Sequence, residues 1–91
     1  MIRLAASLAL LLVFTTARVF GTGADDLFIT VYNQIQQADA QVDAGRTSEA
    51  FAGYAKAQED LKKLRQQYPT WNERVVNYRL RYVADKLEAL K

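Results

Sequence analysis

The chain has 91 residues, of which 51% are hydrophobic and 24% are charged, and it contains no cysteine and no histidine. This length allows one small domain at most. Without cysteine there can be no disulfide, zinc ribbon, iron–sulfur cluster or lipid-modified N-terminal cysteine. Without histidine, the commonest general base and the commonest transition-metal ligand are both missing.

The remaining polar residues also argue against catalysis. Ser48 is the only serine outside the N-terminal segment, and no Ser-His-Asp arrangement can be built. No glycine-rich phosphate loop exists, because Gly21, Gly23, Gly45 and Gly53 each stand alone. We therefore expect a protein that is not an enzyme and that binds no cofactor, metal ion or small-molecule substrate.

The formal net charge of +2 comes entirely from the N-terminal part of the chain. Residues 1–24 contain Arg3 and Arg18 and no acidic residue, whereas the other ten basic residues are balanced by ten acidic residues. The basic pI of about 9.0 therefore says little about partners of the rest of the chain.

Residues 1–24 have the three-part order of a secretory signal peptide. Arg3 precedes an apolar run over residues 4–14, and small and polar residues follow that run. The run is too short for a membrane span, which needs roughly 20 apolar residues. We expect export to the periplasm or the extracellular space, with cleavage after Gly21 or Ala24. The alternative is an uncleaved N-terminal anchor or a buried helix, the anchor being the only route by which we expect the chain to contact a membrane.

The rest of the chain shows apolar residues at helical spacing and few strand signals. The spacing predicts helices over about residues 25–44, 48–68 and 70–90. An acidic first helix beside two mildly basic helices favours a three-helix antiparallel bundle, an all-α fold. The first helix is expected to be capped by Asp25 and ended by Gly45. The second is expected to be capped by Thr47 or Ser48 and ended by Pro69. The third is expected to be capped by Thr70.

Two sets of apolar positions are expected to pack the domain. The positions expected to form the core are Tyr54, Leu61, Leu64, Leu80, Val83 and Leu87. The third helix also has a second stripe, formed by Trp71, Val75, Tyr78 and Tyr82. A helix with two adjacent apolar stripes usually touches two neighbours.

The stretch DAGRTSEAFAGYAKA, residues 43–57, resembles the centre of a tetratricopeptide repeat. In that family a glycine closes the first helix, an acid–alanine pair opens the second, and an aromatic residue and an alanine follow. The corresponding hairpin-packing positions here are Gly45, Ala50, Tyr54 and Ala57. The resemblance implies a helix–turn–helix module for protein–protein contact, and it carries no ligand-binding residues over to this chain. The alternative is a generic three-helix bundle.

Tryptophan, tyrosine and arginine are the residue types that dominate binding hot spots. The candidate partner surface is therefore formed by Trp71, Arg74, Tyr78, Arg81 and Tyr82. The alternative is that the aromatic members pack on the first helix of the same chain. The partner is expected to be another protein or a second copy in a homodimer. The first alternative function is a self-associating structural bundle or coiled coil, and the second is a basic helical binder of nucleic acid or of a membrane surface.

Two further patterns suggest sites that we do not expect. Asp39 and Asp43 are spaced to share a helix face, but two carboxylates make a poor cation site, so both are expected on a solvated face. Basic residues interleaved with aromatics also occur in nucleic-acid binders. We expect no nucleic acid, because the exported chain is neutral and acids interrupt the bases, which are Lys62, Lys63, Arg65, Arg74, Arg79 and Arg81.

Overall fold

The computed structural model describes residues 23–91, which form three α-helices and no strand. The helices are α2 (Ala24–Asp43), α3 (Thr47–Gln67) and α4 (Glu73–Ala89). The predicted all-α class is therefore confirmed for this part of the chain. The predicted signal peptide lies outside the described residues. Within them, no helix combines the length and the apolar character that a membrane span requires.

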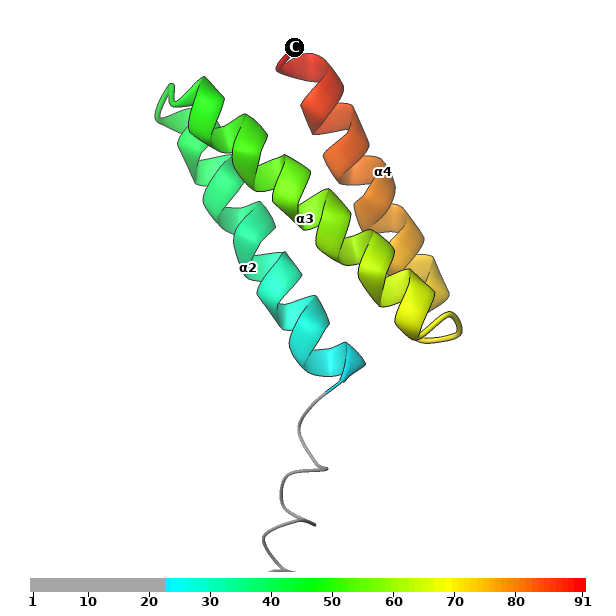
Figure 1. Cartoon of the computed structure of the whole chain (residues 1–91). Helices are drawn as coiled ribbons and strands as arrows, with labels where there is room; N and C mark the ends of the chain where they lie inside the picture. The colour runs from blue at the N-terminus through cyan, green and yellow to red at the C-terminus, as the bar shows by residue number, and fades with distance from the viewer. Residues whose placement is uncertain (1–22) are drawn as a thin grey trace, which may run out of the picture.

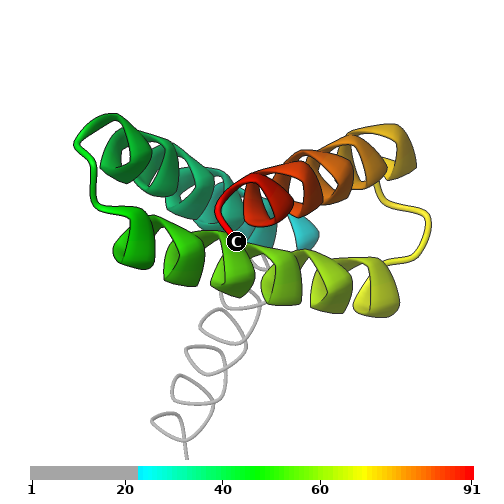
Figure 2. The ribbon, with the colours of Figure 1, turned by 90° about the horizontal axis from the view of Figure 1, so that it is seen from above.

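The three helices are arranged in two layers, one formed by α2 and α4 and the other by α3. Helices α2 and α3 lie side by side and run in opposite directions, and α4 returns along α3 (Figure 1). Seen from above, α2 and α4 lie on the same side of α3 (Figure 2). Helix α3 is thus flanked by both other helices, while one side of α2 and of α4 faces away from it.

The core follows from this central position of α3. Tyr54, Leu61 and Leu64 of α3 are completely buried, as the spacing of apolar residues predicts. Leu80 and Leu87 of α4, expected in the core, are only partly buried. Helix α4 lies at the edge of the structure, so it buries a narrower stripe than α3. Val83 of α4 is completely buried, as predicted. The other large side chains at the centre of the core are Val31, Ile35 and Val76.

Small residues bring α2 and α3 into close contact. Ala50 and Ala57 are fully buried, and Ala38 is 1% exposed. A Cβ atom added to Gly53 would lie 3.2 Å from the Cβ of Ala38, which is tighter than an ordinary van der Waals contact. The two helices therefore approach along a strip that has no room for larger side chains.

The first turn is closed by Gly45, which has φ of +79°. Its N–H donates to the carbonyl oxygen of Val42 at 3.0 Å, and the left-handed conformation is the one that glycine adopts at low cost. The predicted cap at Thr47 or Ser48 is wrong, because Arg46 stands at the cap position and makes no side-chain cap bond. Helix α3 begins one residue earlier than predicted, so both hydroxyl residues lie inside its first turn.

The second turn is longer than predicted. Tyr68 leaves the helical region with φ of −133° and ψ of 69°, as expected for a residue before Pro69. The N–H of Trp71 then donates to the Tyr68 carbonyl oxygen at 3.1 Å, and Asn72 adopts a left-handed φ of 42°. This bond and the left-handed Asn72 hold residues 68–72 in a turn, so α4 begins at Glu73 and Thr70 does not cap it.

Candidate interaction surface

Asp39 joins all three helices by hydrogen bonds. Its carboxylate accepts a hydrogen bond from the Tyr54 hydroxyl of α3, and its Oδ2 atom accepts one from the Tyr82 hydroxyl of α4 at 2.8 Å. Tyr54 is completely buried, and Asp39 and Tyr82 are half-buried. Asp43, one turn further along α2, is exposed as expected. The expectation of a solvated face is wrong for Asp39, which is held between two helices.

This network keeps both tyrosines protonated. Burial, the hydrogen bond to Asp39 and the charge of that carboxylate together raise the pKa of Tyr82 to about 12, and burial contributes most. The pKa of Tyr54 is also raised, first by burial and then by the same carboxylate. A phenolate in either position would face the negative charge of Asp39, so the hydroxyls act as permanent donors at neutral pH.

Trp71 anchors the second turn to the beginning of α2. Its ring packs against Phe28 with centroids 5.4 Å apart and planes at 49°, a favourable tilted geometry. Its Nε1–H donates to Oδ1 of Asp25 at 3.2 Å. Asp25 was expected to cap α2, and this is wrong: Gly23 is at the cap position, and Asp25 lies in the first turn.

The guanidinium of Arg79 lies among three tyrosine rings. Its Cζ atom is 5.1 Å from the ring centroid of Tyr32, 5.5 Å from that of Tyr78 and 5.6 Å from that of Tyr82. These distances fall within the range of cation–π attraction. We call Tyr32, Tyr78, Arg79 and Tyr82 the tyrosine–arginine patch. It links α2 to α4.

The predicted partner surface is therefore divided. Trp71 and Tyr82 turn toward α2 and make the contacts described above, whereas Arg74, Tyr78 and Arg81 are exposed on α4. Tyr78 is 53% exposed. Among residues 23–91, neither Arg74 nor Arg81 has a carboxylate within salt-bridge distance. Their role toward a partner stays a prediction.

A second polar group lies between α2 and α3. Asp60 of α3 is 7% exposed and accepts hydrogen bonds from Gln34 Nε2 and Lys56 Nζ, each at 3.2 Å. The Oε1 atom of Gln34 is buried without a partner among the described residues. Gln34 thus supplies a donor to the buried Asp60 from the neighbouring helix.

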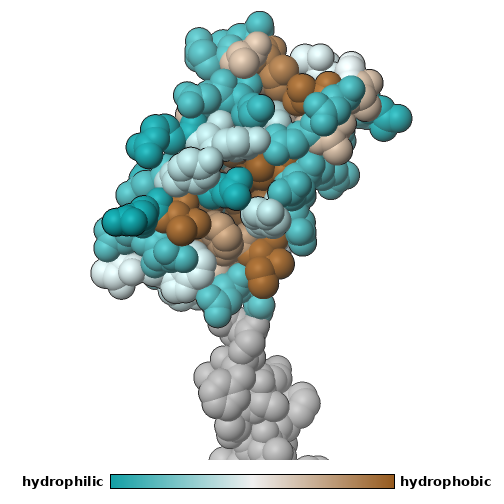
Figure 3. Space-filling model, turned by 180° about the vertical axis from the view of Figure 1, so that it is seen from behind, coloured by the Kyte–Doolittle hydropathy of each residue, from teal (hydrophilic) through white to brown (hydrophobic). Residues whose placement is uncertain are grey.

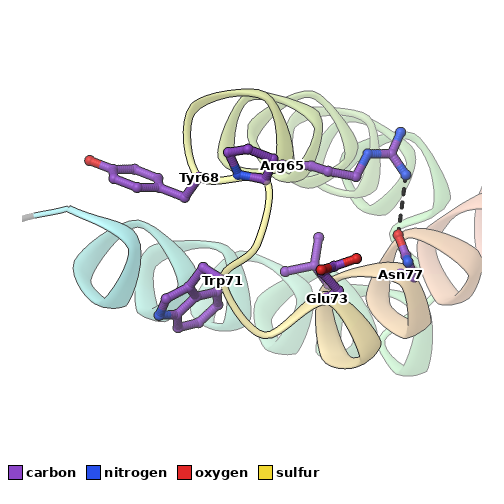
Figure 4. Close-up of a pocket in the computed structure, with 7 residues that line it drawn as sticks. Arg65, Tyr68, Trp71, Glu73 and Asn77 are labelled. Atoms are coloured by element: carbon purple, nitrogen blue, oxygen red, sulfur yellow. Dashed lines mark hydrogen bonds between the residues drawn. The ribbon is translucent and has the colours of Figure 1, made fainter.

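The hollow nearest to the second turn is too small for a ligand. It lies between the end of α3 and the start of α4 and has a volume of about 30 Å³, which is room for one water molecule (Figure 4). Arg65 Nη1 donates to Asn77 Oδ1 at 3.2 Å across one side of it.

The layer formed by α2 and α4 faces the viewer in Figure 3, which shows the molecule from behind. Apolar areas are scattered over this face among hydrophilic side chains. The described residues include five large hydrophobic side chains that are exposed, and α2 and α4 carry three of them: Ile29, Tyr32 and Tyr78. We call the exposed side of these two helices the α2–α4 face.

Comparison with protein-family models, with curated proteins and with solved structures finds no match for the chain. Its function must therefore be inferred from the geometry described above.

The sequence did not predict that Asp39, Asp60 and Arg79 join helices through side-chain contacts. Asp39 is 15 residues from Tyr54 and 43 residues from Tyr82, so local spacing could not pair them. A usable signal did exist for Asp60, because it interrupts the apolar side of the second helix just before Leu61. A charge at such a position is normally paired.

Proposed function

We propose that the chain is an exported, non-enzymatic module that binds a protein partner through the α2–α4 face. The observation that carries this proposal is Tyr78, a tyrosine 53% exposed on the surface of α4. Arg74 precedes it by four residues and Arg81 follows it by three, so all three side chains share one face of the helix. Tyrosine and arginine are the residue types most enriched among binding hot spots.

Rigid support for this face favours protein binding. Val76 and Val83 fix the opposite side of α4 in the core, and Tyr82 and Trp71 tie α4 to α2. An interaction surface that is held in place before binding loses little conformational entropy when a partner docks. Tyrosine adds a large apolar area and a hydroxyl at the cost of only two side-chain torsions.

A reduced tetratricopeptide-like architecture is the finer fold that we propose. The close contact of Ala38 with Gly53 and the burial of Ala50, Tyr54 and Ala57 support it. Helix α4 then corresponds to the first helix of a following repeat, and adjacent helices run antiparallel. One and a half repeats present two helices of one layer to a partner, whereas longer arrays present more.

The test is affinity capture from the exported fraction followed by mass spectrometry. The full chain serves as bait in its wild-type form and as the Tyr78→Ala/Arg81→Ala variant. A matched control, Lys62→Ala/Glu59→Ala, removes two exposed side chains from α3 in the other layer. We expect the same partner to be retained by the wild type and the control and lost with the face variant. Equal retention by all three baits would contradict binding through this face.

Export is tested separately by N-terminal sequencing of protein recovered from the medium or the periplasm. A new N-terminus at Thr22 or Asp25 is expected. Recovery only from the cytoplasm, with Met1 or Ile2 as the first residue, would contradict export and leave the binding face untouched.

A further inference from the structure

Helices α2 and α4 each present an exposed seam with coiled-coil spacing. On α2 the seam is formed by Asp25, Ile29, Tyr32 and Gln36, and on α4 by Arg74, Tyr78, Arg81 and Asp85. Each set steps four, three and four residues, which places its members on one side of a helix. All eight residues are exposed, so the other helices of the described residues leave most of each stripe uncovered.

The two seams lie side by side and start at the same end of the molecule. The bond from Trp71 Nε1 to Asp25 Oδ1 brings the beginning of α2 close to the turn that leads into α4. Further along, Arg79 of α4 lies over the ring of Tyr32. Tyr32 and Tyr78 therefore belong to one continuous surface, the α2–α4 face.

Charge is divided between the two halves of this face. Helix α2 has four aspartates and no basic residue, whereas Arg74, Arg79 and Arg81 lie in the first half of α4. Near the turn the face is thus negative along α2 and positive along α4. A surface with both signs side by side can complement a rotated copy of itself.

We propose that a second copy of this chain occupies the α2–α4 face. The dimer axis is a two-fold axis parallel to the helices, so that α2 of each protomer lies on α4 of its partner. This inference rests on the proposed interaction face and names its partner.

The symmetry operator follows from the charges. A two-fold axis parallel to the helices keeps their starts at the same end and places the aspartates of α2 against the partner's arginines. A two-fold axis across the helices would place α2 on the partner's α2, and both of these helices carry aspartates and no basic residue. Like charges directly opposed are unfavourable, so the parallel axis is selected.

Burial of apolar surface favours the same arrangement. Ile29 is 57% exposed and Tyr78 is 53% exposed, and both lie within the proposed contact. A bundle of this size has a small core, and association is a common way for such chains to gain apolar burial. The dimer would join four helices, α2 and α4 from each protomer, with α3 on the outside.

Sedimentation equilibrium of the chain, purified as cells produce it, tests the proposal. We expect a dimer at micromolar concentration whose dissociation constant rises with salt, because exposed charges are screened. Arg74→Glu/Arg81→Glu places acid against acid and should raise that constant at least tenfold. The matched control, Lys62→Glu/Lys63→Glu, makes the same charge change on exposed residues of α3 and should leave the dimer intact.

A variant with exchanged charges gives the decisive test of the dimer. Adding Asp26→Lys/Gln36→Lys to Arg74→Glu/Arg81→Glu reverses both halves of the face and should restore the dimer. Asp26 and Gln36 are exposed, and changing them keeps the Asp25–Trp71 bond. Circular dichroism of each variant confirms that it is folded.

Three outcomes would overturn the proposal. They are a wild-type monomer at 100-fold higher concentration, a dimer unaffected by Arg74→Glu/Arg81→Glu, or a folded four-residue variant that stays monomeric. If the chain is a monomer that still captures a different protein through Tyr78, the proposed function stands and the partner is not a second copy. A dimer without any captured protein would support the second copy as the partner.

Discussion

Asp39 shows how one side chain can decide how three helices meet. It is half-buried, and a buried carboxylate is tolerated when donors satisfy it. Tyr54 and Tyr82 supply those donors from two different helices. Hydrogen bonds to a charged acceptor are roughly twice as strong as neutral ones. The network therefore fixes the angle at which α4 lies on α2 and α3.

Replacing Tyr54 with phenylalanine should destabilise the fold while keeping its shape. The ring stays in the core, but Asp39 loses its most buried donor, and the expected loss is about 1.5–3 kcal/mol of unfolding free energy. Tyr82→Phe should cost less, about 1 kcal/mol, because water can reach a half-buried carboxylate. Urea denaturation measures both. Equal losses in the two variants would contradict the greater burial of Tyr54.

Stability should fall at alkaline pH because of the same two tyrosines. Their pKa values are raised in the folded state, that of Tyr82 to about 12, whereas an unfolded tyrosine titrates near 10. Below pH 10 both states are protonated, and the stabilisation is complete. Above pH 10 the unfolded state releases protons first, so the unfolding free energy declines as the pH rises toward 12.

Thermal unfolding at pH 8, 10 and 11.5 measures this decline. The double variant Tyr54→Phe/Tyr82→Phe serves as the comparison, because it keeps the other three tyrosines. Its unfolding temperature should decline less steeply with pH than that of the wild type. Parallel declines would show that Tyr54 and Tyr82 do not cause the effect.

The role of Asp39 could not be predicted from the sequence. Its spacing to Asp43 indicates a shared helix face, and exposure is the ordinary state of such residues. What removes Asp39 from water is the arrival of two tyrosines from distant parts of the chain. Apolar spacing predicted the burial of Tyr54, but its acceptor depended on how α3 packs on α2, and the second donor, Tyr82, depended on how α4 crosses α2.

At the scale of helices and turns, Gly45 controls the reversal between α2 and α3. Its φ of +79° is unfavourable for residues with a Cβ atom, and no atom lies within 4 Å of the position that a Cβ would take. Gly45→Ala should therefore cost about 1 kcal/mol through backbone conformation alone. Gly45→Asn should cost less, because asparagine tolerates the left-handed region. Chemical denaturation would contradict this reason if both variants lost the same stability.

Helix positions could be predicted well where apolar spacing and chain breakers agree. Gly45 and Pro69 give sharp signals, and the ends predicted for the first two helices differ from the observed ends by one residue. The start of α4 could not be predicted, because tertiary contacts set it. Trp71 packs on Phe28, and this contact draws residues 70–72 into the turn where Thr70 was expected to cap a helix.

Across the whole molecule, α4 is attached less firmly than the hairpin of α2 and α3. The hairpin is closed by a short turn and by close contact of small residues. Helix α4 buries Val76 and Val83 fully and relies on polar and aromatic contacts for its position on α2. The proposed partner face lies across the junction between the two parts. Its geometry therefore depends on the bonds that hold α4 in place.

Asp39→Ala tests this dependence, because it removes the acceptor shared by the two parts. The Tyr54 hydroxyl would be left buried without its acceptor, and a loss of about 2–3 kcal/mol in unfolding free energy is expected. Asp39→Asn keeps one acceptor oxygen, so its loss of unfolding free energy should be about 1 kcal/mol smaller than that of Asp39→Ala. Asp43→Ala, an exposed aspartate one turn away, is the matched control and should change stability by less than about 0.5 kcal/mol.

Hydrogen exchange of Asp39→Ala then locates the loss. The amide protons of α4 should exchange faster, while those in the facing parts of α2 and α3 keep most of their protection, because Ala38, Ala50 and Ala57 still pack the hairpin. Loss of protection spread evenly over all three helices would contradict a separately attached α4. In that case the hairpin would depend on α4 for its own stability, and the partner face would form only with the complete fold.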